Sequence, residues 1–238
     1  MRVVSAAWPV LGVRAFTTCR AGGVSTGPYA SLNLAAHVGD RAQDVAANRA
    51  ILGREAGLAG TPLWLNQVHG RVAVDAGRPF AGPPEADGSF ATDRGIICAV
   101  LTADCLPVVL ADRSGCCVAV LHAGWRGLAG GILEAGVAAL PVPASRLVAW
   151  LGPAIGAADY EVGDEVRRAF GTEGRAAFTP TAGGRHRADL YALARLRLKA
   201  AGVAAVYGGG FNTYSDPDLY SYRRTPICGR MATLAWIA

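Results

Sequence analysis

Two histidines and one cysteine are the side chains of this sequence best suited to binding a metal ion. His69 and His122 each stand where an apolar run ends, and Cys105 has a polar setting between Asp104 and Pro107. Imidazole nitrogen and thiolate sulfur are preferred zinc ligands, and three protein ligands with an open fourth position are typical of catalytic zinc. Because the three residues are 36 and 17 positions apart, they form no local motif. Hydrogen-bonded histidines at strand ends and a buried thiol are an equally good interpretation of these residues alone.

A predicted β-hairpin would bring Cys105 and His122 together. Two apolar runs, Leu106–Ala111 and Cys116–Leu121, flank a polar stretch that begins at Asp112. Short apolar runs joined by such a stretch are typical of buried strands in a hairpin. If the last residue of the first run pairs with the first residue of the second, Cys105 pairs with His122. Paired residues share a face with Cβ atoms about 5 Å apart, although a one-residue bulge would abolish this pairing.

Strand and helix patterns alternate over the rest of the chain. Helices are predicted from Asp40 to Glu55 and over Arg126–Leu140, Glu161–Phe170 and Asp189–Ala201. Strands are predicted at Val3–Ala7, Gly12–Thr18, Leu63–Asn66, Arg71–Asp75, Arg146–Leu151, Val203–Tyr207, Leu219–Arg223 and Met231–Ile237. The mixed order of elements favours an α+β fold. Since no linker or repeat interrupts the chain, we expect a single domain over residues 1–238.

Composition limits the classes of protein to which the chain can belong. With 52% apolar and 17% charged residues among 238, the chain is globular and long enough for a sizeable core. Its net charge of +5 is scattered, which gives little support to nucleic-acid binding and only weakly indicates anionic substrates. The first residues lack the apolar run of a signal peptide, and no apolar run is long enough to span a membrane. We therefore expect a cytoplasmic protein with free thiols and no membrane or nucleic-acid partner, and a monomer as the default.

The sequence resembles the laccase-domain family, also called multicopper polyphenol oxidoreductases, in stretches that run from one end of the chain to the other. The matching stretches are the Arg20–Asp40 loop, NQVHG (66–70), ADG (86–88), TADCLPV (102–108), HAGWRG (122–127) and DLYSYRRTPICGRMA (218–232). The resemblance implies a purine nucleoside phosphorylase with adenosine deaminase activity. It also implies one zinc ion (Zn²⁺) held by His69, Cys105 and His122. The implied fold has mixed β-sheets packed together with helices outside, similar to the laccase-domain and cytotoxic necrotizing factor-like folds.

Phosphate binding requires fixed positive charge, which arginine supplies through bidentate hydrogen bonds. The resemblance assigns this role to Arg49, for which an exposed helix arginine is the alternative. Arg126 is a second candidate. Arg223 is a third, and because it and Arg224 alternate along a predicted strand, only one of the two should face the site. Asn33 could hydrogen-bond ribose or phosphate, and a role in a turn is equally consistent with its setting.

Four further residues have both a functional and a structural interpretation. His37 and Asp87 are candidate proton carriers, but a lone histidine is more often a structural hydrogen-bonding group. An aspartate in Ala-Asp-Gly is more often a turn residue. Trp125 and Tyr222 could stack on a purine ring, although burial is the commoner fate of an aromatic side chain.

The expected function is that of a zinc-dependent purine nucleoside phosphorylase. Adenosine, inosine, guanosine or methylthioadenosine would react with phosphate to give the free base and ribose 1-phosphate, and adenosine would also be deaminated. The catalytic residues would be Cys105, His122 and His69, through the metal ion that they bind.

Three other functions remain open from the sequence. Cys105 and His122 could form the metal-free dyad of a cysteine hydrolase or deamidase. A structural zinc site would need a fourth ligand, and Cys19, His37 and Cys228 are the candidates. The old family name implies a copper-dependent polyphenol oxidase, but the four histidines of the chain are too few for the several copper ions of a laccase. A single copper ion could still replace zinc, because Cu²⁺ binds nitrogen ligands more tightly.

Overall fold

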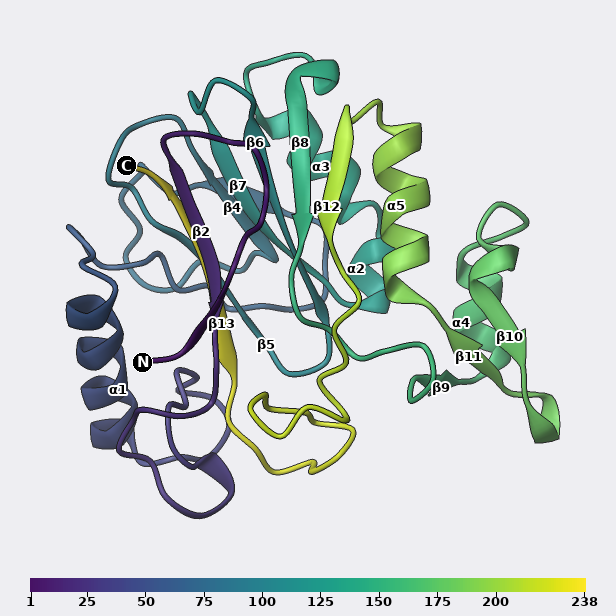
Figure 1. Cartoon of the computed structure of the whole chain (residues 1–238), viewed down its shortest axis with the longest axis horizontal. Coiled ribbons are helices and arrows are strands. Elements are labelled where there is room, and N and C mark those ends of the chain that lie inside the picture. Colours follow the sequence, from purple (N-terminus) through teal and green to yellow (C-terminus); the bar gives the residue numbers. More distant parts are fainter.

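Two β-sheets packed face to face form the centre of the protein in the computed structural model, which describes residues 1–238 (Figure 1). The strands are β1 (Val3–Ser5), β2 (Val13–Thr18), β3 (Ala73–Asp75), β4 (Gly88–Ala91), β5 (Cys98–Thr102), β6 (Leu106–Asp112), β7 (Val118–Ala123), β8 (Leu147–Leu151), β9 (Glu161–Val162), β10 (Phe178–Pro180), β11 (His186–Ala188), β12 (Ala205–Gly208) and β13 (Met231–Ile237). The larger sheet has the order β12-β8-β6-β7-β4-β3, and the smaller sheet has the order β1-β2-β13-β5. β12 is parallel to β8 and β3 is parallel to β4, so the larger sheet is mixed.

The helices lie outside these two sheets (Figure 1). The α-helices are α1 (Ala42–Glu55), α2 (Trp125–Gly130), α3 (Ile132–Ala139), α4 (Asp164–Ala169) and α5 (Leu190–Ala200). Short 3₁₀ helices are present at Gly27–Tyr29, Ala144–Arg146, Arg175–Ala177 and Ala182–Gly184. None of these helices combines the length and the apolar character needed to cross a membrane.

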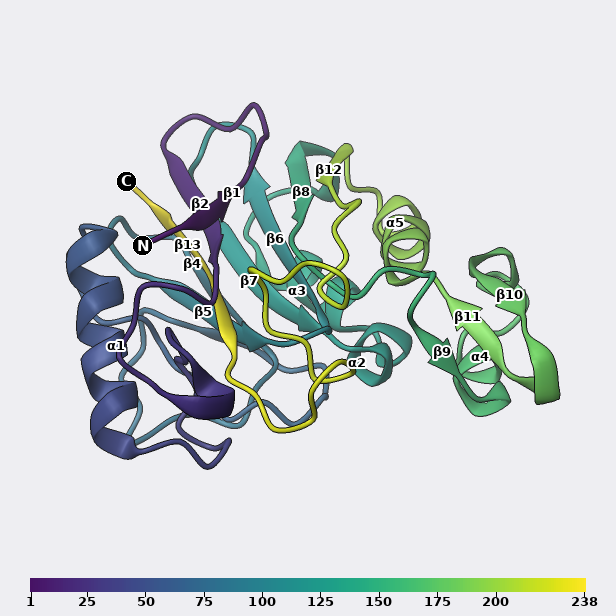
Figure 2. The ribbon, with the colours of Figure 1, turned by 60° about the horizontal axis from the view of Figure 1, so that its bottom comes forward.

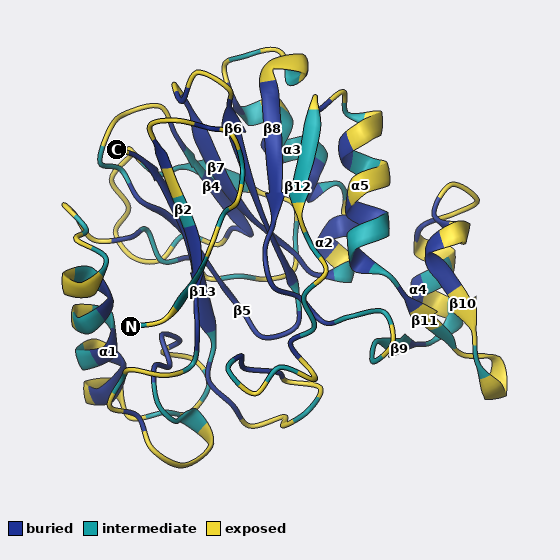
Figure 3. Cartoon of the chain, in the orientation of Figure 1, coloured by how far each residue is buried: buried dark blue, intermediate teal, exposed yellow.

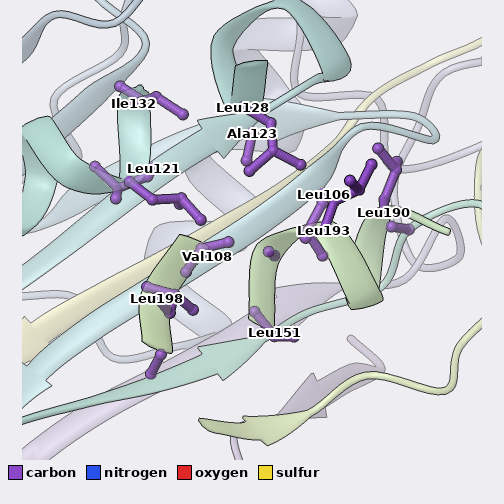
Figure 4. Packing of buried hydrophobic residues seen from close by; sticks show 14 of the residues in the cluster. Leu106, Val108, Leu121, Ala123, Leu128, Ile132, Leu151, Leu190, Leu193 and Leu198 are labelled. Carbon is purple, nitrogen blue, oxygen red and sulfur yellow. The ribbon is translucent and has the colours of Figure 1, made fainter. Parts of the chain in front are cut away.

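The central strands are buried on both faces. Between the sheets, Val109 and Val120 of the larger sheet pack with Val100 of the smaller sheet. On the outer face of the larger sheet, Val108 and Leu121 lie against α2, α3 and α5 (Figure 4). The outer face of the smaller sheet is covered by α1 and the loop before it, and Figure 3 shows the helices exposed only on the side away from the sheets. Cover on both faces explains why β6 and β7 are continuous apolar runs.

A third, smaller sheet stands to one side of the packed sheets. Its strand order is β10-β11-β9, and α4 lies beside it (Figures 1 and 2). The chain enters this part after β8 and returns from it directly into α5. The segments that join it to the two larger sheets therefore lie next to the carboxyl end of β8.

The predicted α+β class is confirmed, and several predicted elements lie where the sequence indicates. The helices predicted to begin near Asp40 and Asp189 are α1 and α5, and the last predicted strand is β13. Asp189 caps α5 by accepting a hydrogen bond from the amide of Ala192 at 2.9 Å. Each of these elements carries its own local signal, a capping residue or an uninterrupted apolar run.

Two predicted helices are shorter than expected. The helix predicted over Arg126–Leu140 is divided into α2 and α3, because Gly131 adopts a left-handed conformation with a φ of 98°. The helix predicted over Glu161–Phe170 begins only at Asp164, since the first two residues pair in β9.

The strand predicted over Leu219–Arg223 is wrong, because these residues form turns. The guanidinium of Arg224 donates hydrogen bonds to the carbonyl oxygens of Thr213, Tyr214, Asp216 and Leu219. These four bonds hold the segment as a compact loop. Its buried Leu219 and Tyr220 produce the apolar pattern that resembles a strand.

The β6–β7 hairpin is confirmed, but its register differs from the prediction by two residues. Pro107, and not Cys105, pairs with His122. Cys116 lies exposed in the turn instead of in the second strand. A shift of two residues keeps every side chain on its predicted face. Cys105 therefore remains on the face of His122, as its diagonal neighbour instead of its direct partner.

The carboxylate of Asp112 accounts for this register. It is fully buried, and it accepts hydrogen bonds at 2.9 Å from the Ser114 amide and from both Nε and Nη2 of Arg146. These bonds draw residues 113–116 into the turn. The amide of Asp112 then pairs with the carbonyl of Cys117 at 3.1 Å, two positions further along than the sequence pattern suggests.

We expect Asp112→Asn to destabilise the protein by about 2 kcal/mol in urea unfolding at neutral pH, because charged hydrogen bonds are lost. Burial raises the pKa of Asp112, but its hydrogen bonds to Ser114 and Arg146 outweigh this and hold the pKa well below its usual range. The carboxylate therefore stabilises the fold above the unfolded pKa of about 4, and this contribution is lost progressively as the pH falls below it.

The difference between wild type and Asp112→Asn should accordingly shrink in acid. Asp93→Asn is the matched control, because Asp93 is exposed and makes no ion pair or side-chain hydrogen bond. An equal effect of the two substitutions, or a difference that does not change with pH, would show that Asp112 does not stabilise the turn through its charge.

Candidate active site

His69, Cys105 and His122 lie together at one end of the packed sheets. One ligand atom from each lies within 4.8 Å of the others, and Sγ of Cys105 is 3.9 Å from Nε2 of His69. The two imidazole rings meet edge to face, with centroids 4.8 Å apart. His122 is buried, Cys105 is half-buried and His69 is exposed. The structure therefore brings together three residues that are far apart in the sequence.

Each of the three residues stands at or near the end of a strand. Cys105 comes directly before β6, and His122 is the second-last residue of β7. His69 lies in the loop before β3. Because β6 and β7 are neighbours in the sheet, their ends fix two of the three side chains on a rigid support.

The carboxylate of Asp87 holds the third residue in place. This carboxylate is fully buried, and it accepts hydrogen bonds from the amides of Val68 (3.2 Å), His69 (2.9 Å) and Gly70 (2.6 Å). It also accepts one from Nδ1 of His122 at 2.8 Å. Burial raises the pKa of Asp87, but the bonds from His122 and the backbone amides outweigh this and lower it. Asp87 is therefore ionised and holds the site in place. This role differs from both roles that the sequence suggests for it, a turn residue and a proton carrier.

The backbone is strained on both sides of the group. His69 (φ 61°) and Asp104 (φ 91°) are the two non-glycine residues with positive φ, a conformation that persists where the surroundings enforce it. Asp87 holds His69. The carboxylate of Asp104 accepts a hydrogen bond from Oγ1 of Thr213 at 2.5 Å and another from the Arg223 amide at 2.6 Å. Tertiary contacts therefore compensate for the strain at both positions.

Gly124 leaves the space that the group occupies. A Cβ atom at this position would lie 3.0 Å from Sγ of Cys105 and 3.0 Å from Cδ2 of His69. Both distances are shorter than ordinary van der Waals contact. The glycine of HAGWRG after His122 is therefore required by the packing of the three side chains.

Charge coupling makes Cys105 acidic and His122 basic. Burial raises the pKa of the Cys105 thiol, but His122 and His69 together lower it to about 6. Burial lowers the pKa of His122, but Cys105 and Asp87 raise it to about 9. At neutral pH and without a metal ion, the two residues therefore form a thiolate–imidazolium pair. The thiolate is also the form of cysteine that binds metal ions.

The three donors fit a zinc ion. Zinc binds thiolate sulfur at about 2.3 Å and imidazole nitrogen at about 2.0–2.1 Å, which places tetrahedral ligand atoms roughly 3.3–3.6 Å apart. The three ligand atoms lie within 4.8 Å of one another, so side-chain shifts of about 1 Å would let them share one ion. The bond from Nδ1 of His122 to Asp87 leaves Nε2 free, which is the usual arrangement around a metal-binding histidine. No fourth histidine, cysteine or carboxylate joins the group. His69, Cys105 and His122 would therefore supply three ligands to the ion.

The group forms part of the wall of a cavity of about 540 Å³. The loops after β5 and β8, the loops before β3 and β13, and the first residues of α2 contribute most of its lining. The lining residues are His37, Gln67, His69, Leu101, Thr102, Ala103, Asp104, Cys105, His122, Trp125, Arg126, Ile155, Tyr160, Tyr222, Arg223 and Arg230. A volume of this size is in the range of small-molecule sites, which is about 300–1,000 Å³.

Two of the predicted arginines line the cavity. Arg126 makes no hydrogen bond to the protein, and its guanidinium lies 4.4 Å from the ring centroid of Trp125. Arg223 lies over Tyr160 at 5.3 Å and donates from Nη1 to the carbonyl of Glu161 at 3.0 Å. Arg224 points into its own loop, so only one of the neighbouring pair faces the cavity. The expected alternation holds, although the segment is a loop and not a strand.

Arg49 and Asn33, the other two predicted substrate-binding residues, lie outside the lining of this cavity. Arg49 donates from Nε to the carbonyl of Leu34 at 3.0 Å, and its guanidinium lies 4.2 Å from the ring centroid of Trp64. Asn33 is fully buried, and its Oδ1 accepts hydrogen bonds from the amides of Ala35 and Arg230. Both side chains are engaged in holding the N-terminal loop.

Several residues that line the cavity are not predicted from the sequence. Arg230 lies in the matching C-terminal stretch, but nothing in the sequence separates it from its neighbouring arginines. Gln67 is the second residue of NQVHG, and its side-chain amide exchanges two hydrogen bonds with the backbone of Leu101. Tyr160 carries no local signal at all. His37, Trp125 and Tyr222, which have structural alternatives in the sequence, do line the cavity.

Known proteins resemble this chain over nearly its whole length. A purine nucleoside phosphorylase of Pseudomonas aeruginosa is 51% identical over 236 residues, which cover 97% of this chain and 96% of that protein. The purine nucleoside phosphorylase YfiH of Escherichia coli is 45% identical with the same coverage. Among solved structures, a Neisseria meningitidis protein matches with a TM-score of 0.96 and 47% identity, over 100% of this chain and 99% of that one. YlmD from Geobacillus stearothermophilus matches with a TM-score of 0.89 and 32% identity, over 97% and 94%.

The sequence of this chain also matches a family model directly. The model of the family described as multi-copper polyphenol oxidoreductase laccase matches residues 14–238. That range includes the three metal-binding candidates, Asp87 and the whole lining of the cavity. This chain therefore belongs to the multi-copper polyphenol oxidoreductase laccase family.

Proposed function

We propose that this protein is a zinc-dependent purine nucleoside phosphorylase that also deaminates adenosine. Its substrates would be adenosine, inosine, guanosine or methylthioadenosine together with phosphate, and its products the free base and ribose 1-phosphate. The observation that carries the proposal is the His69–Cys105–His122 group in the wall of a cavity that is also lined by arginines. The names of relatives up to 51% identical support the phosphorylase activity.

The arginines are suited to binding the phosphate. Arg126 has all its guanidinium donors free, and Arg223 keeps Nε and Nη2 free because only Nη1 bonds to the protein. Guanidinium groups bind phosphate oxygens through paired, charge-assisted hydrogen bonds. In phosphorolysis, an oxygen of the phosphate held here would form the bond to C1′ of the ribose. The bond from C1′ to the purine nitrogen would break, and the base would leave with its electron pair.

The chain holds the metal ligands in the form that zinc requires. Asp87 accepts a hydrogen bond from Nδ1 of His122, so that Nε2 is the nitrogen that would bind zinc once its proton is displaced. When bound, zinc would act as a Lewis acid, which serves both polarisation of the nucleoside and activation of water for deamination. Trp125 and Tyr222 offer aromatic faces at the cavity wall for a purine.

The metal-free cysteine hydrolase is the second candidate, and one contact favours it. The hydrogen bond of 2.8 Å between His122 and Asp87 completes a Cys105–His122–Asp87 series that resembles a cysteine nucleophile with its base and orienting carboxylate. Copper is an alternative metal for the same three donors. Metal content and the requirement for phosphate separate these candidates from the zinc-dependent phosphorylase.

We expect elemental analysis of the purified protein to find one zinc ion per chain. Cys105→Ala and His122→Ala should lose most of this zinc, because two ligands do not hold it. Gly124→Ala should also lose zinc, since the new Cβ would lie 3.0 Å from Sγ of Cys105.

Gly130→Ala is the matched control, because a Cβ at that glycine of α2 meets nothing within 4 Å. Full zinc content in the Cys105 and His122 variants would refute the proposed ligands. Equal zinc loss in both glycine variants would indicate a general effect on folding.

Zinc affinity should rise with pH, because binding displaces the proton of His122. Between the thiol pKa of about 6 and the imidazole pKa of about 9, release of that proton strengthens binding about tenfold per pH unit. Competition with a chelator of known pH dependence measures the slope. A flat profile between pH 6.5 and 8.5 would mean that His122 carries no proton in the metal-free protein.

Loss of Arg126 should separate the two activities. A charged hydrogen bond to phosphate contributes about 1.5–3 kcal/mol, so Arg126→Ala should slow phosphorolysis of inosine about 10- to 100-fold. Deamination of adenosine in phosphate-free buffer should change much less, because hydroxide attack uses no phosphate. Chromatography of the released bases and nucleosides measures both rates.

Arg49→Ala provides the comparison, because Arg49 lies outside the cavity lining and should affect both activities equally. Release of free base without phosphate would indicate a hydrolase. A selective loss of phosphorolysis in Arg49→Ala, with none in Arg126→Ala, would show that Arg49 and not Arg126 binds the phosphate.

A further inference from the structure

The cavity has more guanidinium groups than one phosphate requires. Three of its lining residues are arginines, and each lies over an aromatic ring that also lines the cavity: Arg126 over Trp125, Arg223 over Tyr160 and Arg230 over Tyr222. None of the three forms an ion pair with a carboxylate of the protein. Asp104 is the one acidic lining residue, and its two oxygens already accept hydrogen bonds from Thr213 and from the Arg223 amide.

The guanidinium groups that bond to the protein are held by different contacts. Arg223 is fixed to the carbonyl of Glu161 beside Tyr160, and its charge and that of Arg126 both act on Tyr160, opposing the burial that raises the pKa of its hydroxyl. Arg230 is fixed elsewhere, on the N-terminal loop. His37 belongs to the same N-terminal loop and also lines the cavity.

Arg230 is held ready for an anion. Its amide donates to Oδ1 of Asn33 at 2.9 Å, and its Nη1 donates to the carbonyl of Cys228 at 2.8 Å. Its Nε and Nη2 have no protein partner. A guanidinium fixed through one nitrogen, with the other two free at a cavity wall, matches the paired oxygens of a phosphate group.

We propose that Arg230 forms a second anion subsite, so that this cavity binds nucleoside 5′-monophosphates with their own phosphate on Arg230. The purine nucleoside part of this ligand rests on the proposed function. Arg126 and Arg223 supply paired guanidinium donors for one inorganic phosphate. The charge of Arg230 is then left for a phosphate that the nucleoside itself carries.

The proposal is tested by comparing the affinities of inosine and inosine 5′-monophosphate. Each ligand is titrated into the zinc-loaded protein in phosphate-free buffer of constant ionic strength. Neither ligand can be phosphorolysed without phosphate, and neither has an amino group to lose. Calorimetry should show that the monophosphate binds about tenfold more tightly than inosine. Arg230→Ala should reduce this ratio to about one, and Arg230→Lys should give an intermediate ratio, because lysine keeps the charge without the paired donors.

Arg78→Ala is the matched control, because Arg78 is exposed, pairs with Asp75 and lies outside the cavity lining. This variant has the same net charge as Arg230→Ala and should keep the wild-type ratio. Three results would each overturn the proposal: equal binding of the two ligands to wild type, a ratio abolished by Arg126→Ala but not by Arg230→Ala, or weaker binding of inorganic phosphate by Arg230→Ala with an unchanged ratio. A separate assay of inosine with phosphate shows whether the proposed phosphorylase activity itself fails.

Discussion

The buried carboxylate of Asp87 is the interaction on which the rest of the site depends. It accepts four hydrogen bonds, three from consecutive backbone amides and one from His122. A buried carboxylate is tolerated only when such donors replace its water. The same bonds impose the left-handed backbone of His69 and fix the tautomer of His122. One carboxylate thereby sets the positions of two of the three potential metal ligands, and it does so from the strand end next to β7.

The sandwich of sheets makes this arrangement rigid. β6 and β7 are covered by the smaller sheet on one face and by α2, α3 and α5 on the other. Their ends cannot shift without disturbing close packing on both sides. The loops that complete the cavity are correspondingly polar, since they lie where this cover stops. The candidate metal ligands therefore lie at the edge of a core whose residues are mostly apolar.

The sequence predicts those features that have local causes. The hairpin, α1 and α5 follow from apolar runs and capping residues, and the metal-binding candidates follow from residue type. The hairpin register does not follow, because it depends on the contact of Asp112 with Arg146, 34 residues away. β9, β10 and β11 are two or three residues long, too short for an alternating pattern to be recognised. Tyr160 reaches the cavity only through the path of the chain between those strands and β8.

The displacement of Arg49 and Asn33 from the cavity has a similar cause. Arg49 donates to the carbonyl of Leu34, the amide of Leu34 donates to the carbonyl of Arg230, and the amide of Arg230 donates to Asn33. Both residues thus act on the cavity through Arg230, which stands about 180 residues or more further along the chain. A pattern within the Arg20–Asp40 loop cannot reveal this dependence. The matching stretches at the two ends of the chain are one structural unit, two loops that together hold the backbone of Arg230 at the cavity wall.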